Sequence, residues 1–476
     1  MRREDTDRAL ELAVEAARDY LAGVDERLVR SPSADDAANG FGGSLPDEGA
    51  GALTAVKELL DGGPEASVAS AGPRFFHWVI GGVTPAALAA DWVASALDQN
   101  AAAWDSSPLG TRLEELSLSW LKELFGLPAE WGGVLTTGAT MANFTGLAAA
   151  RRWWGERHGV DVDDEGFAGL PQVPVFSSGH IHASAYKALA LLGIGRKSVR
   201  TFTRDATGRL DDVALERALR ELKGAPAILE ASAGEVNAGD FDPIERMADL
   251  AEEYDAWLHV DGAFGLFAAV SPRIAHLVSG IDRAHSVISD GHKWLNVPYD
   301  CGFAFVRDPT ALHRSFRVTA AYLPEVDAAK PHLAARGPES SRRSRGLAVW
   351  ATLRAYGRSG CRELIERHLD LAQHLAGRVD EAPDLERLAD VPLNIVCFRY
   401  RPPGVPENEL DDLNRHLGAD VLADGRVYVG TTLYAGRVAF RPAIVNWRTR
   451  EEDVDLLVEV VRELGRARAG LEQSRV

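Results

Sequence analysis

The sequence alternates apolar runs with segments of helical periodicity, and this alternation constrains the fold more than any other feature. Val173–Phe176, Ala227–Ser232 and Trp257–Val260 are apolar runs of strand length, and a helical segment from Ile244 to Tyr254 joins the last two. Repeated strand–helix–strand units favour a parallel sheet with helices on both faces. Ligands and catalytic groups of such sheets lie at the carboxyl ends of the strands. We therefore predict an α/β fold whose functional residues directly follow apolar runs.

Two residues capable of cofactor chemistry follow such runs. Asp261 ends one run and is followed by the small residues Gly262 and Ala263, and Lys293 comes after His292 in the turn that follows a later run. A desolvated lysine amine can form a Schiff base with a carbonyl, and a carboxylate beside small residues can pair with the nitrogen of a flat heteroaromatic ring. Pyridoxal phosphate (PLP) requires both partners. Each residue alone is ambiguous, because most aspartates at strand ends are turn residues and most lysines are solvated.

A third segment is suited to bind an anion. Gly138, Ala139 and Thr140 stand between an apolar run and an Ala-rich helical segment. Free N–H groups and the positive dipole end at the start of a helix attract phosphate, although many similar turns bind nothing. No Gly-Lys-Ser/Thr follows, so the turn is not a P-loop, and the sequence has no GxGxxG, which disfavours a nucleotide-binding Rossmann enzyme.

A pair of nearby histidines raises the alternative of a metal site. His180 and His182 are two positions apart, but no third ligand lies near them in the sequence. A structural or catalytic metal needs at least three protein ligands in the usual zinc arrangements. We therefore predict no metal.

Several of these motifs together resemble a known family. Val260–Gly265, His292–Leu295 and Asp300–Gly302, with the pattern His-x-Ser-x-x-Lys-Ala at His182–Ala188, are similar to the signature of the group II PLP-dependent decarboxylases. Members of this family act on aromatic amino acids, glutamate, histidine and diaminobutyrate. The resemblance extends from about Pro73 to Trp447. It implies a fold-type I PLP enzyme, similar to aspartate aminotransferase, that converts an L-amino acid to its amine and carbon dioxide.

The resemblance also implies a domain organisation. We expect an N-terminal helical segment and linker at residues 1–72, a PLP-binding large domain with a mostly parallel sheet at 73–345, and a small C-terminal α+β domain at 346–476. In the last domain, Thr449 and Glu452 predict a capping box for a helix that ends at Gly465.

The family motifs assign a role to each matching residue. Catalytic roles fall on Lys293, Asp261, His182 and His292, which would respectively hold PLP, pair with its ring nitrogen, stack on its ring and lie near the substrate carboxylate. The implied cofactor-binding positions are Gly138, Ala139, Thr140, His182, Asp261, Ala263, Asp290, His292 and Lys293. The implied substrate-binding positions are Phe75, His77 and Trp78. Which amino acid is the substrate stays open. The joint presence of the four catalytic residues disfavours a binding or regulatory protein on a decayed PLP fold.

Two departures from the family pattern bear on the chemistry. The family usually has Thr where this chain has Glu235, and the family's mobile lid carries a tyrosine that protonates the carbanion, whereas no tyrosine lies between Pro324 and Ser341. Tyr322 and His332 are the alternatives that the sequence offers. Without a lid acid, oxygen can oxidise the carbanion, and the alternative product is then an aldehyde, as in the aldehyde-synthase members of the family. Transamination is a further alternative.

Composition and charge narrow the partners. The net charge of −18 argues against nucleic acid or an anionic membrane as the main partner and favours a small molecule. The family resemblance implies that this molecule is an amino acid substrate. The acidic N-terminus and the lack of any long apolar run predict no signal peptide and no membrane span. The three cysteines have no CxxC spacing, which fits a reducing cytoplasm.

The family resemblance implies a homodimer with its active site at the subunit interface. An amphipathic helix at about Asp5–Val29, tethered by an extended linker at Ser31–Gly51, fits packing on a second subunit, although packing on its own domain explains it equally well. The segment Trp104–Pro108 is similar to a family loop that reaches the neighbouring active site.

Overall fold

The centre of the protein is a seven-stranded sheet with strand order β1-β7-β6-β5-β4-β2-β3. The computed structural model describes residues 3–317 and 330–470. The strands are β1 Gly132–Thr136, β2 Val175–Ser177, β3 Val199–Thr201, β4 Ile228–Ser232, β5 Trp257–Asp261, β6 Ser286–Asp290 and β7 Gly302–Val306. β7 runs antiparallel to its neighbours β1 and β6, and the other pairs are parallel. The predicted α/β fold with a mostly parallel sheet is confirmed.

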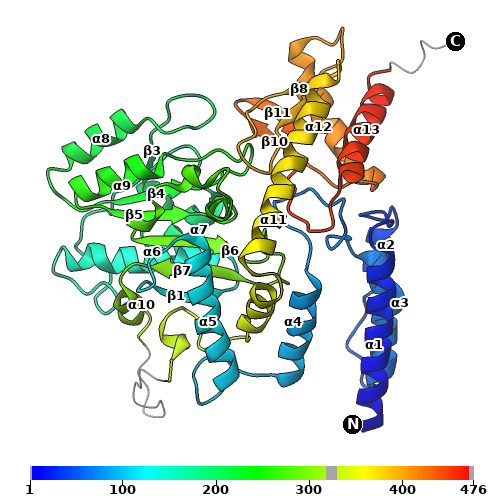
Figure 1. Ribbon diagram of the computed structural model, residues 1–476, viewed down its shortest axis with the longest axis horizontal. Coiled ribbons are helices and arrows are strands. Elements are labelled where there is room, and N and C mark those ends of the chain that lie inside the picture. The colour runs from blue at the N-terminus through cyan, green and yellow to red at the C-terminus, as the bar shows by residue number, and fades with distance from the viewer. Residues whose placement is uncertain (1–2, 318–329, 471–476) are drawn as a thin grey trace.

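Helices cover both faces of this sheet (Figure 1). On one face lie α6 Ala139–Glu156, α7 Ala183–Leu191 and α10 Pro309–Ser315, and on the other lie α5 Pro108–Phe125, α8 Asp212–Glu221 and α9 Ile244–Glu253. Short 3-10 helices are η1 Arg196–Ser198, η2 Gly265–Val270, η3 Ala275–Val278, η4 Ile281–Arg283 and η5 Leu333–Ala335. This layering buries both faces, as expected for a parallel sheet.

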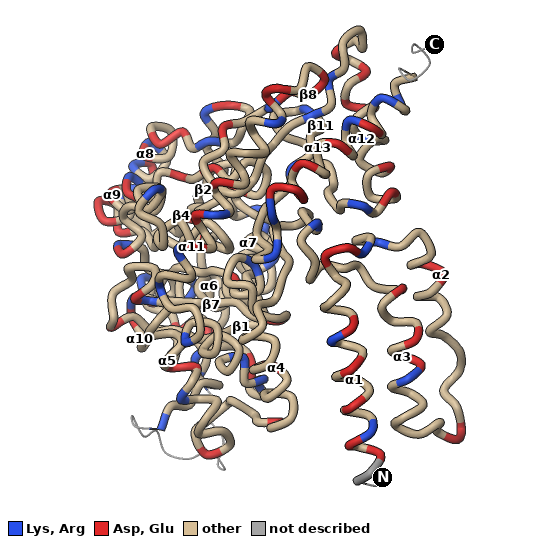
Figure 2. Tube along the Cα trace, turned by 45° about the vertical axis from the view of Figure 1, so that its right-hand side comes forward, with Lys and Arg blue, Asp and Glu red and all other residues tan. Residues whose placement is uncertain are grey.

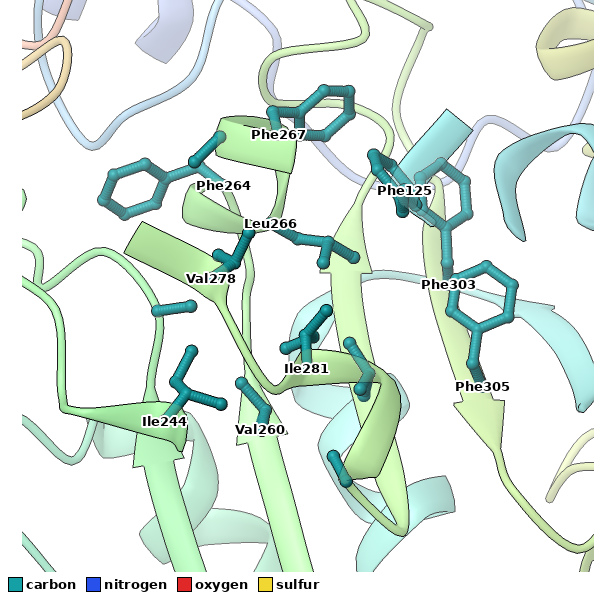
Figure 3. Packing of buried hydrophobic residues seen from close by; sticks show 14 of the residues in the cluster. Phe125, Ile244, Val260, Phe264, Leu266, Phe267, Val278, Ile281, Phe303 and Phe305 are labelled. Carbon is teal, nitrogen blue, oxygen red and sulfur yellow. The ribbon is translucent and has the colours of Figure 1, made fainter. Parts of the chain in front are cut away.

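The alternation of side chains along β5 decides which layer of helices each of its residues faces. Val260 points into the apolar layer beneath α5 and α9, together with Phe303 and Phe305 of β7 (Figure 3). In this layer Phe125 and Phe267 meet edge to face, with ring centroids 5.1 Å apart. Because successive side chains in a strand point to opposite faces, Asp261 lies on the face covered by α6 and α7.

A smaller sheet and three helices form the C-terminal part. The antiparallel strands, in the order β10-β11-β9-β8, are β8 Leu385–Arg387, β9 Phe398–Tyr400, β10 Thr431–Tyr434 and β11 Arg437–Phe440, and the helices are α11 Gly346–Glu381, α12 Glu407–Asp424 and α13 Glu451–Arg468. α11 contacts both α5 beside the large sheet and β8 of the small one. The domain boundaries at residues 72 and 345 stay predictions.

Two expectations about α13 were wrong. Its first turn is capped by Asp453, whose Oδ2 accepts from the Arg450 N–H at 3.0 Å. The Thr449 hydroxyl instead donates to the Pro73 carbonyl at 2.7 Å. Gly465 does not end the helix but lies within it, where an added Cβ would stand 2.7 Å from the Tyr400 ring. Thr449 and Gly465 therefore make tertiary contacts, and they do not cap or end the helix.

The N-terminal segment stands beside the rest of the chain (Figures 1 and 2). It comprises α1 Arg3–Gly23, α2 Ala34–Asn39 and α3 Ala52–Ala66, and α4 Pro85–Leu97 follows it. The expected linker at Ser31–Gly51 is therefore interrupted by a short helix. A backbone hydrogen bond from Val29 N to Gly425 O at 2.7 Å anchors the segment to the C-terminal part. Among the described residues, none of the helices is long and apolar enough to cross a membrane.

Candidate active site

Lys293 lies in the turn after β6 and contacts a buried carboxylate. Its Nζ is 3.2 Å from Asp290 Oδ2, and the side chains of Lys293 and Asp290 are 16% and 3% exposed. The Phe264 ring centroid lies 5.8 Å from the same nitrogen. Asp290 Oδ1 is buried and has no hydrogen-bond partner among the described residues. The amine is therefore held at the carboxyl end of the sheet, largely shielded from water.

Asp261 ends β5 in a fixed orientation. Its Oδ2 accepts from Asn143 Nδ2 at 2.8 Å, and its Oδ1 accepts from the Ala263 N–H at 3.1 Å. Asn143 belongs to α6, which covers this face of the sheet. Since each oxygen has an N–H donor, the carboxylate cannot rotate without losing a bond.

His182 caps the start of α7 and presents its ring outward. Its Nδ1 accepts from the Ser184 N–H at 3.2 Å and lies 2.7 Å from Ser184 Oγ. Burial lowers the pKa of His182. The negative charge of Asp261 acts against this shift, and the positive charge of Lys293 adds to it. The ring is therefore neutral and lies near both charged groups. His180 is directed elsewhere, with its Nδ1 3.4 Å from Asp242 Oδ1.

Gly138, Ala139 and Thr140 form a cradle at the start of α6. The first helical hydrogen bond runs from Ala142 N to Gly138 O at 2.9 Å, so the amides before Ala142 have no acceptor within the helix. Gly138 has a φ of +136°, and an added Cβ would stand 2.9 Å from Cε1 of His292. The glycine therefore lets the His292 ring, in the turn that carries Lys293, approach the start of the helix closely.

His292 lies between this cradle and Asp290. Its Nδ1 accepts from the Cys301 N–H at 3.2 Å, and its Nε2 is 3.6 Å from Asp290 Oδ2. Burial lowers the pKa of His292, so the ring is neutral and carries its proton on Nε2. The Tyr299 ring packs on it at a centroid distance of 4.4 Å. Sequence reasoning did not single out Tyr299.

The residues that meet here fit PLP in their chemistry. The site offers an amine, a carboxylate on the same sheet edge, a neutral imidazole and, at Ala139 and Thr140, amides with no acceptor within the helix. These groups match an aldehyde, a ring nitrogen, a ring face and a phosphate.

Comparison with known proteins gives the family. A model of the pyridoxal-dependent decarboxylase conserved domain matches residues 66–401. The chain belongs to this family. It is 29% identical over 399 residues to an aromatic-L-amino-acid decarboxylase of Bacillus atrophaeus, covering 82% of this chain and 81% of that protein. It is 32% identical over 432 residues to an L-2,4-diaminobutyrate decarboxylase of Rhizobium meliloti (strain 1021), covering 89% and 84%.

A solved structure agrees with this assignment. The crystal structure of Oryza sativa TDC with PLP and tryptamine has a TM-score of 0.90 and 27% identity to this decarboxylase, covering 98% of this chain and 99% of that one. The predicted family, the fold-type I architecture and PLP as cofactor are confirmed. The protein is a PLP-dependent amino-acid decarboxylase.

The three predicted substrate residues of this decarboxylase differ in exposure. Phe75 is buried and stacks on Tyr428 with centroids 5.4 Å apart, whereas Trp78 is 58% exposed. His77 lies between them, and its Nδ1 accepts from the Gly430 N–H at 3.0 Å. Burial, assisted by the charge of Arg441, lowers the pKa of His77 to about 4, so the ring is neutral. Their contact with substrate stays a prediction.

Arg441 is a residue of this region that sequence reasoning missed. It follows β11, and its Nη1 donates to the Val236 carbonyl at 3.2 Å. No carboxylate oxygen of a described residue lies within ion-pair distance of it, although Glu235 is close enough to raise its pKa against the lowering effect of burial. The signal in the sequence was a lone charge directly after an apolar strand.

Glu235, which replaces the family's usual threonine, is directed into its own turn. Its carboxylate accepts from the N–H groups of Asn237 and Ala238, both at 2.8 Å. Burial raises the pKa of Glu235, partly offset by these hydrogen bonds. The Glu235 side chain thus stabilises its own loop. It does not supply the hydroxyl that the family's threonine would offer at this position.

Of the two residues considered as replacements for the lid tyrosine, only His332 lies within the described residues. Tyr322 lies outside the described residues. His332 forms a backbone bridge with Ala103. It also lies near His313 of α10: burial is the main cause that lowers the pKa of His313, and the charge of His332 contributes to the same shift. Because α10 follows the antiparallel strand β7, it lies at the edge of the sheet where the parallel strands begin. Within one chain, His332 is therefore at the edge opposite Lys293.

Proposed function

We propose that Lys293 binds PLP covalently through its amine, that Asp261 pairs with the ring nitrogen, and that His182 stacks on the ring. The amides of Ala139 and Thr140, with Gly138 beside them, would bind the phosphate. When bound, the cofactor draws off the electron pair released as carbon dioxide leaves. The observation that carries this proposal is the meeting of the Lys293 turn, the Asp261 carboxylate and the start of α6 at one edge of the sheet.

The residues around the cofactor site divide the remaining tasks. His292, neutral and hydrogen-bonded to the Cys301 amide, would lie beside the substrate carboxylate and orient it. Arg441, without a carboxylate partner among the described residues, would form an ion pair with a carboxylate of the incoming amino acid. Trp78 and His77 would lie along its side chain. Phe264 limits the access of water to the lysine amine.

A labelling experiment tests the assignment of Lys293. Borohydride reduction of the holoenzyme followed by peptide mapping should place the cofactor label on Lys293. Screening the enzyme against the standard amino acids and diaminobutyrate for carbon dioxide release then identifies the substrate. A label on another residue would overturn the site.

The product is the second question, and the lid sequence gives a specific reason to ask it. No tyrosine lies between Pro324 and Ser341. We propose the amine as product, and aldehyde as the alternative that this absence favours. Stoichiometric amine with carbon dioxide supports the first. Aldehyde with carbon dioxide, ammonia and peroxide, and with consumption of oxygen, supports the second.

We also propose a homodimer with the active site at the subunit interface. Leu10 of α1 and Leu59 of α3 are 60% and 59% exposed, and Trp92 of α4 is 41% exposed. A second subunit would bury these side chains, and it would also bring the loop 104–108 and His332 of one chain toward the site of the other. Light scattering of the active fraction tests this, and an active monomer would contradict it.

A cytoplasmic location is proposed on the state of the cysteines. Cys301, Cys361 and Cys397 are all buried and unpaired. Thiols without disulfides are typical of reducing compartments. Fractionation of cells that express the tagged protein tests this assignment.

A further inference from the structure

A row of polar side chains crosses the interior of the sheet beneath the active site. Ser177, Glu230, His259 and Ser286 stand in register on β2, β4, β5 and β6, and all four are fully buried. The interior of a parallel sheet is usually apolar. Buried polar groups are retained only when they are hydrogen-bonded, so the partners of this row indicate its use.

The bonds of His259 form a chain in which each donor is determined. Trp257 Nε1–H donates to Ser286 Oγ at 2.9 Å, which lies 2.7 Å from His259 Nδ1. His259 Nε2 is 2.8 Å from Asn143 Oδ1. Because the Asn143 amide nitrogen donates to Asp261, its oxygen faces His259, and the proton must be on His259 Nε2. Ser286 then donates to Nδ1. Burial lowers the pKa of His259 to about 4, consistent with this single neutral tautomer.

Asn143 connects His259 to both Asp261 and His182, the two residues proposed to face the cofactor. Its Nδ2 donates to Asp261 Oδ2 at 2.8 Å and to Ser184 Oγ at 3.2 Å. The Ser184 hydroxyl proton is therefore directed to His182 Nδ1, which leaves the proton of His182 on Nε2. α6 can approach this closely because Gly146 has no side chain: an added Cβ would stand 2.9 Å from Cε1 of His259.

We infer that His259 and Asn143 are positioning residues that act through Asp261 and His182, holding the carboxylate toward the cofactor nitrogen and the imidazole in one tautomer. The inference rests on the proposed function of Asp261. A purely structural role for the row would affect folding but not the cofactor. Outer hydrogen bonds of this kind orient the residues that contact a bound group.

Matched substitutions of His259 test the inference through PLP affinity. In His259→Gln the amide N–H can replace the donor at Nε2, whereas His259→Leu removes it. Titration of apoenzyme with PLP, followed by tryptophan fluorescence and cofactor absorbance, should show binding weakened about 10- to 100-fold in the Leu variant, the range for loss of an outer hydrogen bond that orients a binding residue. The Gln variant should stay within about threefold of wild type. Equal affinity in the Leu variant, or equal loss in both folded variants, would overturn the inference.

Three further variants keep the test decisive. Ser177→Ala removes a hydroxyl of the same row that donates to Glu230 at 2.6 Å and not to the chain, and it should leave PLP affinity unchanged. In an Asp261→Asn background, His259→Leu should add little, because both changes act on one carboxylate; additive losses contradict the inference. If His259→Leu does not fold, Asn143→Ala provides the same measurement, and retained affinity there also overturns the inference.

The outcomes separate this inference from the proposed function. If borohydride does not label Lys293, or Asp261→Asn binds PLP as wild type does, the proposed function itself fails. If Lys293 is labelled and Asp261→Asn weakens binding while His259→Leu and Asn143→Ala do not, only the positioning chain is refuted.

Discussion

The proposed cofactor side and the proposed substrate side of the active site are built in different ways. On the cofactor side, Asp261 and Lys293 follow neighbouring strands of one sheet, and both oxygens of Asp261 are hydrogen-bonded. On the substrate side, the loop 75–78 meets residues of the small sheet region more than three hundred positions away, through the stacked pair Phe75–Tyr428 and the bond from Gly430 N to His77. Arg441 has no carboxylate partner among the described residues.

This difference separates reaction type from substrate choice. Strand ends fix the cofactor-facing groups rigidly, because the register of a buried sheet cannot slip without exposing its apolar side chains. The substrate side depends on how a loop and a second sheet dock, so its side chains can change without disturbing the chemistry. Family members that act on different amino acids are compatible with this division.

Lys293→Ala breaks the cofactor side most severely. Loss of the covalent anchor should lower kcat by on the order of 10³-fold or more, because a group that acts as nucleophile has no substitute. The absorbance band of the lysine-bound cofactor should be replaced by that of the unattached aldehyde at equimolar PLP. Lys197→Ala, an exposed lysine, is the control. Full activity in Lys293→Ala would mean that another amine carries the cofactor.

Asp261→Asn keeps the shape of the acid but removes its charge. We expect kcat to fall by about 10²- to 10³-fold, the range for one lost electrostatic partner of a transition state, with a smaller change in KM. Asp255→Asn is the matched control, because Asp255 forms a surface ion pair with Arg157, with Oδ1 and Nη2 2.7 Å apart. A change confined to KM would place Asp261 on the substrate side and remove the contrast drawn above.

The positions of the residues proposed for the cofactor side were largely predictable from the sequence, because these residues directly follow apolar runs. Asp261 and Lys293 follow runs that become β5 and β6, and Gly138 precedes an Ala-rich helix. What could not be predicted was the direction of the hydrogen bonds. Asn143 lies in a motif that pointed to phosphate, yet its amide bonds Asp261 and His259.

Contacts between distant segments account for most of the errors. The Thr449 hydroxyl bonds the carbonyl of Pro73, a residue 376 positions earlier, and so does not cap α13. Gly465 is needed for close packing on Tyr400 rather than for a helix end. The position of Arg441 depends on the contact between the end of β11 and the loop after β4, where its Nη1 donates to the Val236 carbonyl. Local pattern carries no information on such pairings.

Arg441→Met sharpens the comparison from the substrate side. If the guanidinium binds a substrate carboxylate, KM should rise by about 10- to 100-fold, as for a lost hydrogen bond to a charged group, while PLP affinity stays unchanged. Arg437→Met provides the control, because Arg437 is the first residue of β11, the strand that Arg441 follows, and its side chain is 47% exposed and lies 3.7 Å from Glu386. Loss of PLP binding in Arg441→Met would assign the residue to the cofactor instead.

Trp78→Ala should have the smallest effect, and a selective one. The ring is 58% exposed, so its removal costs little folding energy; an aromatic substrate that stacks on it should lose about fivefold in kcat/KM, and a small aliphatic substrate should lose nothing. Phe75→Ala should behave in the opposite way, because Phe75 is 3% exposed and its loss from a packed site costs about 3–5 kcal/mol of unfolding free energy. Thermal unfolding and steady-state kinetics of both variants separate the two cases. If Trp78→Ala affects all substrates equally, the ring shapes the entrance rather than the choice of amino acid, because only a contact with the side chain discriminates between substrates.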